Sequence, residues 1–149
     1  MIRIYLDVCC LNRPFDDQQQ PRIRLESEAV LLILRYCEQG IFEWLTSDIV
    51  DLEIEQTNDN IRKGRLQFIM SYTSHRVAIK DSVHKRAEYF ESLGIKGWDA
   101  YHLAAAEHGK ADVYLTTDDK LLNRANHHKR ELHVHVANPL GWIREVENQ

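Results

Sequence analysis

Short apolar runs that predict β-strands alternate along this chain with segments of helical periodicity, and this alternation is the strongest constraint on its fold. The predicted strands cover residues 2–8, 42–46, 77–79, 112–115 and 133–136, and a polar loop is predicted over residues 12–20. Strands that alternate with helices favour a parallel sheet covered by helices on both faces. With 149 residues, the chain has the length of a single domain.

Acidic residues stand where predicted strands end or predicted helices begin. They are Asp7, Glu53, Asp99, Asp118 and Asp119. In an open α/β sheet the carboxyl ends of the strands share one edge, where ligands bind, so acids far apart in sequence can converge there. Carboxylates gathered without cationic partners typically hold hard cations such as Mg²⁺ or Mn²⁺.

Such an acid cluster has a specific chemistry in phosphodiester hydrolysis. Carboxylates hold two cations about 3.5–4 Å apart; one activates a water and the other stabilises the leaving 3′-oxygen. Asp7 is the strongest candidate for a direct ligand, because the end of a buried central strand is a rigid platform. Asp99 and Asp118 are predicted at helix N-termini, where the helix dipole favours an anion. Glu53 lies one turn into its helix.

Each acid also has a simpler explanation. Asp99, Asp118 and Asp119 could serve only as helix N-caps, and Glu53 alone could be a solvated helix residue. Asp7 is harder to explain in this way, because a carboxylate at the end of an apolar strand needs a partner. The argument for a metal site therefore depends on the whole set.

Four motifs in order resemble those of the PIN-domain ribonucleases, which include the VapC-type toxins of bacterial toxin–antitoxin pairs. The first is the apolar strand Ile4-Tyr5-Leu6-Asp7, and the second is a serine, Ser47, six residues before Glu53. The third is Asp99 leading an Ala-rich helix, and the fourth is Thr116-Thr117-Asp118 after a strand. The resemblance spans essentially residues 1–149, which we expect to form a single PIN-like nuclease domain.

The resemblance implies a three-layer α/β/α sandwich with a five-stranded parallel sheet. It implies a Mg²⁺- or Mn²⁺-dependent ribonuclease whose catalytic and metal-binding residues are Asp7, Glu53, Asp99 and Asp118, with Asp119 as a further metal candidate. The expected partners are RNA, a cognate antitoxin of a type II pair and a second copy of the chain in a homodimer. No membrane partner is expected.

Polar residues around the acids are candidates for a supporting role. Ser47 and Thr116 could orient the acids by hydrogen bonding, or serve as a helix cap and a strand-end hydroxyl. Asn12 could contact a phosphate or act as a turn residue, and His102 could face the site or be a satisfied core histidine. Val8 and Cys9 replace the small hydroxyl residue that more often follows the first acid in the family.

Two rival functions remain open. The first is a catalytically weak PIN-like module that binds RNA or protein, against which the complete acid set speaks. The second is another phosphoryl-transfer protein, such as a receiver domain, but Asp16 and Asp17 fit its acidic pair poorly and Lys120 lies at a helix start.

Composition narrows the class of protein. The net charge of −4 argues against a broadly basic nucleic-acid binder, although it does not exclude a nuclease with local phosphate attraction. The three cysteines lack metal-ligand spacing, which favours reduced thiols in a cytoplasmic protein. No apolar run reaches the roughly 18 residues of a membrane-spanning helix.

Overall fold

The first strand of the chain lies at the centre of the sheet. In the computed structural model, which describes all residues 1–149, five parallel strands have the order β3-β2-β1-β4-β5. The strands are β1 (Ile2–Leu6), β2 (Phe42–Ser47), β3 (His75–Val77), β4 (Val113–Leu115) and β5 (His135–Ala137). The register places Tyr5 of β1 between Leu45 of β2 and Tyr114 of β4.

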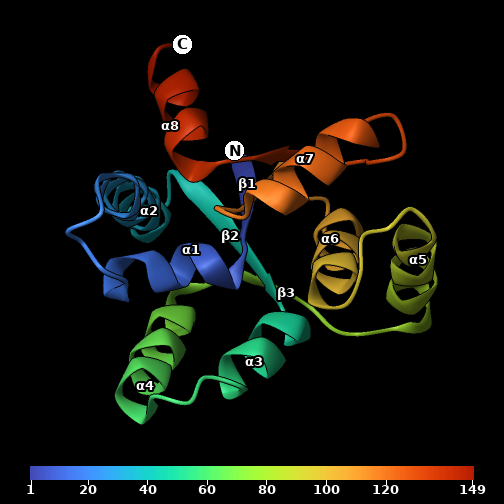
Figure 1. The fold of residues 1–149 in the computed structure, drawn as a ribbon, viewed down its shortest axis with the longest axis horizontal. Coiled ribbons are helices and arrows are strands. Elements are labelled where there is room, and N and C mark those ends of the chain that lie inside the picture. Colours follow the sequence, from blue (N-terminus) through green and yellow to red (C-terminus); the bar gives the residue numbers. More distant parts are fainter.

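Helices cover both faces of this sheet (Figure 1). They are α1 (Val8–Asn12), α2 (Pro21–Glu38), α3 (Asp48–Glu55), α4 (Asn60–Ile69), α5 (Asp81–Ser92), α6 (Trp98–His108), α7 (Asp119–His127) and α8 (Pro139–Glu147), with 3₁₀ turns η1 (Arg13–Phe15) and η2 (Met70–Tyr72). None of the helices has the length and apolar character to cross a membrane.

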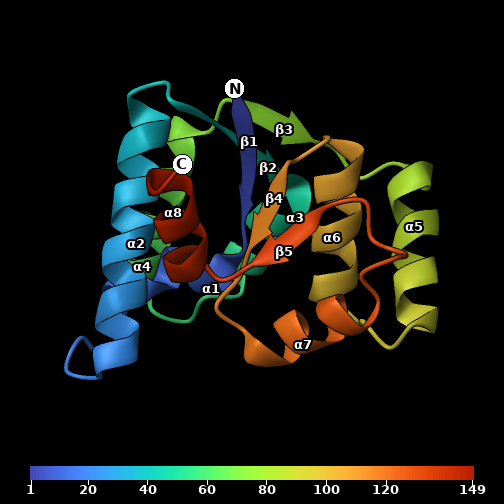
Figure 2. The same cartoon turned by 90° about the horizontal axis from the view of Figure 1, so that it is seen from above.

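The layer of each helix follows from the strand order. The chain moves outward from β1 to β3, and then returns across the sheet to β4 and β5. Because crossover connections between parallel strands are right-handed, this reversal places the later helices on the opposite face. Figure 2 shows α2, α4 and α8 on one side of the sheet and α5, α6 and α7 on the other. The predicted three-layer α/β/α class is therefore confirmed.

Several predicted boundaries differ from the structure. β1 ends at Leu6 rather than at residue 8, because α1 begins at Val8, and η1 occupies part of the predicted polar loop. β3 and β5 cover residues 75–77 and 135–137 rather than 77–79 and 133–136. Their bounds follow from pairing with β2 and β4, whereas Val134 is buried outside any strand. The sequence also predicts Asp81 as the cap of the helix after β3, but Lys80 occupies the cap position and Asp81 is the first residue of α5.

Candidate metal centre

The centre of the candidate site is the carboxyl end of β1. Asp7 follows this strand directly, and its backbone N–H donates a 2.9 Å hydrogen bond to the carbonyl of Leu115 at the end of β4. The Asp7 side chain is buried, and its Oδ2 accepts a 2.8 Å hydrogen bond from Oγ1 of Thr116. Although Asp7 occupies the N-cap position of α1, its carboxylate makes no capping hydrogen bond. The carboxylate also forms no ion pair with any residue, so it is available to a cation.

Glu53 reaches the same edge from α3. Its side chain is half-buried, and Oε1 accepts a 2.7 Å hydrogen bond from Nε2 of His102 on α6. His102 is fully buried, and its other ring nitrogen, Nδ1, lies 2.7 Å from the hydroxyl of Tyr5. Glu53 is therefore held by a hydrogen bond from a buried residue, so it is not the solvated helix residue of the simpler explanation.

Asp99 enters the site from the start of α6. Gly97 caps this helix with φ of +60° and ψ of −133°, a conformation that only glycine adopts readily, and Asp99 is the second helical residue. Because Gly97 occupies the cap position and Asp99 lies inside the first turn, Asp99 is not the N-cap of α6; its side chain is half-buried.

The charge environment of Asp99 shows that the acids converge. Burial, followed by the negative charges of Asp7, Asp118 and Glu53, raises the pKa of Asp99 from 3.8 to about 6, while His102 opposes the shift. Like charges disfavour the ionised carboxylate only when they lie close together. The charges of Asp7, Asp118 and Glu53, which come from three other segments, therefore act on Asp99, whereas the group of ligand atoms that lie within 4.8 Å of one another contains only Asp7, Glu53 and His102.

Asp118 combines a structural and a site position. Its Oδ1 accepts the backbone N–H groups of Lys120 at 2.9 Å and Leu121 at 3.5 Å, so it does cap α7. Its own N–H donates to Thr116 Oγ1 at 3.1 Å, which connects it to the Asp7 hydrogen bond. Because both capping bonds use the same oxygen, the second carboxylate oxygen remains open.

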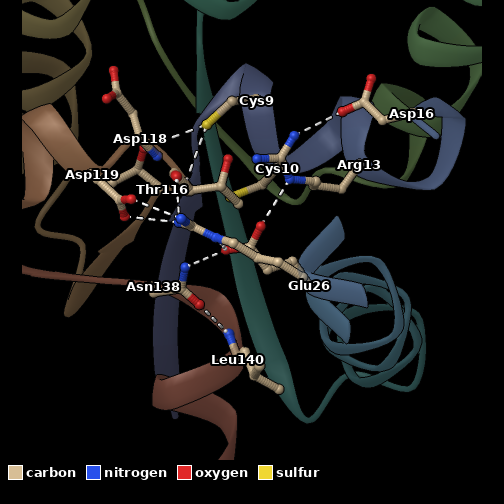
Figure 3. Close-up of polar contacts among 12 residues, drawn as sticks. Cys9, Cys10, Arg13, Asp16, Glu26, Thr116, Asp118, Asp119, Asn138 and Leu140 are labelled. Carbon is tan, nitrogen blue, oxygen red and sulfur yellow. Dashed lines mark hydrogen bonds and ion pairs between the residues drawn. The ribbon is translucent and has the colours of Figure 1, made fainter. Parts of the chain in front are cut away.

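Asp119 is turned toward a cation of the protein itself. Its two oxygens accept hydrogen bonds of 2.8 and 2.7 Å from the guanidinium of Arg22 on α2. These bonds hold the pKa of the Asp119 carboxyl below its usual range. Figure 3 shows Asp119 pointing into this polar network, while Asp118 extends away from it beside Cys9.

Sequence reasoning missed a buried glutamate in this network. Glu26 is 1% exposed and accepts hydrogen bonds from Arg13 at 2.9 Å, Arg22 at 3.2 Å and Asn138 at 2.6 Å (Figure 3). Arg22 therefore joins Glu26 to Asp119. A signal was present, because Glu26 stands on the apolar face of α2, three, four and seven residues before buried positions of the same helix.

Among the supporting candidates, Thr116 and His102 contact acids directly, whereas Ser47 and Asn12 do not. Ser47 is fully buried and its Oγ lies 2.6 Å from the hydroxyl of Tyr5. Asn12 donates to the Val8 carbonyl and accepts from Arg62. Sequence reasoning also missed Tyr5, which it treated only as part of the first strand.

Side-chain chemistry at this edge fits a divalent cation. Asp7, Glu53 and His102 each offer a ligand atom, and these atoms all lie within 4.8 Å of one another. Carboxylate oxygens are the preferred ligands of Mg²⁺ and Mn²⁺. The negative charges of Asp7, Asp118 and Glu53 contribute to the raised pKa of Asp99, and a bound cation would offset their repulsion.

Comparison with solved structures shows that the fold is PIN-like. The chain resembles FitAcB from Neisseria gonorrhoeae with a TM-score of 0.59 and 19% identity, over 91% of this chain and 97% of that one. It also resembles VapBC2 from Rickettsia felis, bound to a DNA fragment from their promoter, with a TM-score of 0.54 and 13% identity over 93% and 98% of the two chains. No family model and no curated protein matches the sequence.

Proposed function

We propose that this protein is a Mg²⁺- or Mn²⁺-dependent endoribonuclease and the toxin of a type II toxin–antitoxin pair. The observation that carries the proposal is the clustering of ligand atoms of Asp7, Glu53 and His102 within 4.8 Å of one another, and the negative charges of Asp7, Asp118 and Glu53 also contribute to the raised pKa of Asp99. An acid cluster of this kind destabilises the metal-free protein, and its function is explained if it holds divalent cations. The PIN-like fold places it at the sheet edge where α/β proteins bind ligands.

The four acids have distinct parts in this proposal. Asp7 and Glu53 are the direct ligands, because protein hydrogen bonds from Thr116 and His102 already orient them. Asp99 and Asp118 complete the negative site around the metal and its water molecules, with Asp119 outside it because of its pairing with Arg22. When bound, divalent cations lower the pKa of coordinated water and stabilise the charge that develops on the phosphate.

Cleavage of a mixed RNA pool by the purified protein tests this function. We expect cleavage with Mg²⁺ or Mn²⁺ and its loss with EDTA or in Asp7→Asn. Glu28→Gln, which changes an exposed acid on α2, is the matched control and should cleave like the wild type. Absence of cleavage by folded, inhibitor-free protein would instead support an RNA- or protein-binding module. Equal cleavage by wild type and Asp7→Asn would identify a contaminating nuclease.

A protein partner is part of the proposal. On α4 and η2, Ile61, Phe68 and Tyr72 are 71%, 66% and 50% exposed, and the rings of Phe68 and Tyr72 are in contact with centroids 5.9 Å apart. Clustered exposed apolar side chains are typical of interaction surfaces. We assign this patch to the antitoxin, in keeping with the VapC-type resemblance.

Co-expression tests the partner. The small reading frame that a toxin gene is expected to have beside it should yield a protein that co-purifies with this chain and suppresses cleavage. Phe68→Ser should weaken that complex without affecting cleavage by the free chain. The homodimer that the family resemblance implies has a separate test, which is the molar mass of the free chain by light scattering.

A further inference from the structure

Three consecutive hydrogen bonds run from the core to Glu53. The Ser47 hydroxyl lies 2.6 Å from the Tyr5 hydroxyl, which lies 2.7 Å from Nδ1 of His102, and His102 Nε2 lies 2.7 Å from Glu53 Oε1. Ser47, Tyr5 and His102 are all fully buried, at 0% exposure. Ser47 and His102 lie 42 and 97 positions from Tyr5 in sequence, so the chain of bonds forms only when the sheet and α6 have packed together.

Hydrogen-bonding capacity fixes the direction of this chain. An ionised carboxylate only accepts hydrogen bonds, so the proton between His102 and Glu53 belongs to Nε2 of a His102 that donates to Glu53. In neutral imidazole Nδ1 then lacks a proton and accepts from Tyr5, and Ser47 donates to the Tyr5 oxygen.

We propose that Tyr5 and Ser47 are positioning residues that hold His102 as its Nε2–H tautomer, so that His102 orients Glu53 and is not itself a metal ligand. The proposal depends on the proposed function only in taking Glu53 as part of a metal site. It distinguishes a site in which His102 orients Glu53 from a site in which His102 itself binds the metal. The short distances among Asp7, Glu53 and His102 are compatible with both.

The competing arrangement is a site in which His102 binds the metal together with Asp7 and Glu53. A ring nitrogen that carries a proton has no lone pair to offer, so Nε2 could ligate only after its bond to Glu53 broke. Nδ1 could ligate only after the ring left Tyr5. The first change would remove the hydrogen bond that orients Glu53, and the second would remove the hydrogen bond between the buried Tyr5 hydroxyl and Nδ1.

A neighbouring tyrosine provides a matched control for the test. The Tyr5 ring stacks on the Tyr114 ring with centroids 5.3 Å apart, and the buried Tyr114 hydroxyl has no hydrogen-bond partner. Tyr5→Phe and Tyr114→Phe therefore remove the same atom from two stacked rings, but only the first breaks the chain of bonds. Ser47→Ala interrupts the chain at its other end and serves if Tyr5→Phe does not fold.

Two measurements on each variant test the proposal without requiring catalysis. Nitrogen NMR of the histidine rings in the metal-free and the Mg²⁺-bound protein, assigned with His102→Gln, reports the tautomer of His102. Titration with Mn²⁺, followed by the electron paramagnetic resonance of the free ion, reports metal affinity. We expect an Nε2–H tautomer in the wild type and in Tyr114→Phe. Loss of an orienting partner typically weakens metal binding about 10–100-fold, which we expect for Tyr5→Phe and Ser47→Ala.

Either of two results would overturn the proposal: equal Mn²⁺ affinity in Tyr5→Phe and Tyr114→Phe, or loss of the Nε2 proton of His102 when Mg²⁺ binds. The second result would make His102 a ligand. If the tautomer and affinity results hold but no variant, including the wild type, cleaves RNA, the positioning role stands and the ribonuclease proposal fails.

Discussion

The Thr116 hydroxyl donates a 2.8 Å hydrogen bond to Oδ2 of Asp7 across 109 residues of sequence. Oγ1 of Thr116 also accepts the backbone N–H of Asp118, so a single hydroxyl orients the acid after β1 and the segment after β4. Orientation of this kind matters because a metal ligand must present its lone pairs at a fixed angle.

Thr116→Val should therefore weaken Mn²⁺ binding and RNA cleavage about 10–100-fold, while the fold persists because valine has nearly the same shape. Thr46→Val is the control, since the buried Thr46 hydroxyl has no hydrogen-bond partner. The measurements are Mn²⁺ titration and initial cleavage rates. Equal losses in the two variants would show that the hydroxyl of Thr116 has no orienting role.

Asp99→Asn should stabilise the metal-free protein much more at pH 8 than at pH 4, which lies just above the ordinary pKa of the carboxyl. The folded-state pKa of Asp99 is raised from 3.8 to about 6, so folding disfavours its ionised form. Below the lower value the carboxyl is protonated in both states and nothing is lost; as pH rises through the interval, stability falls, and above the higher value the full loss is present. Asparagine carries no charge and escapes this loss.

For a half-exposed group, solvent screening reduces the gain to about 1 kcal/mol at pH 8. Urea unfolding at both pH values, in EDTA, measures it. A gain of the same size at pH 4 would contradict the electrostatic explanation, and the exposed-site variant Glu28→Gln controls for loss of an acid elsewhere.

The fold and the positions of several site acids could be predicted from sequence. The side-chain contacts between residues far apart in sequence could not. The alternation of strands and helices predicts the parallel sheet; Asp7 lies at the end of β1 and Asp99 at the start of α6, as the sequence predicts. The partner of Asp119 could not be predicted, because Arg22 meets it only through the packing of α2 beside α7's first turn. The same applies to Tyr5 and His102, which sequence places 97 residues apart.

Glu26→Ala should reduce the free energy of unfolding by about 3 kcal/mol, because it leaves Arg13 and Arg22 without their shared buried carboxylate. Glu28→Ala, on the exposed face of the same helix, should change stability by less than about 0.5 kcal/mol. Urea denaturation of both variants measures the difference. Similar small effects in the two would mean that the buried network contributes specificity rather than stability.

Gly109→Ala should destabilise the protein by about 1–3 kcal/mol through overpacking. A Cβ at this position would lie 2.8 Å from Cγ2 of Val77 and closer still to a methyl of Leu45. Gly64→Ala in α4 is the converse control, because nothing lies within 4 Å of its added Cβ and alanine favours helix by up to about 1 kcal/mol. Thermal unfolding should shift downward for the first variant and upward for the second; a shift in the same direction would refute the packing argument.

The central position of β1 also affects when activity can arise during synthesis. β1 leaves the ribosome first, yet one of its two neighbours, β4, begins only at Val113, and Thr116 and Asp118 follow later still. A nascent chain that ends before Thr116 lacks both the fourth acid and the hydroxyl that orients the first. Under the proposed function, a growing chain therefore cannot cleave RNA until Thr116 and Asp118 have been added, and products terminated before Thr116 lack nuclease activity.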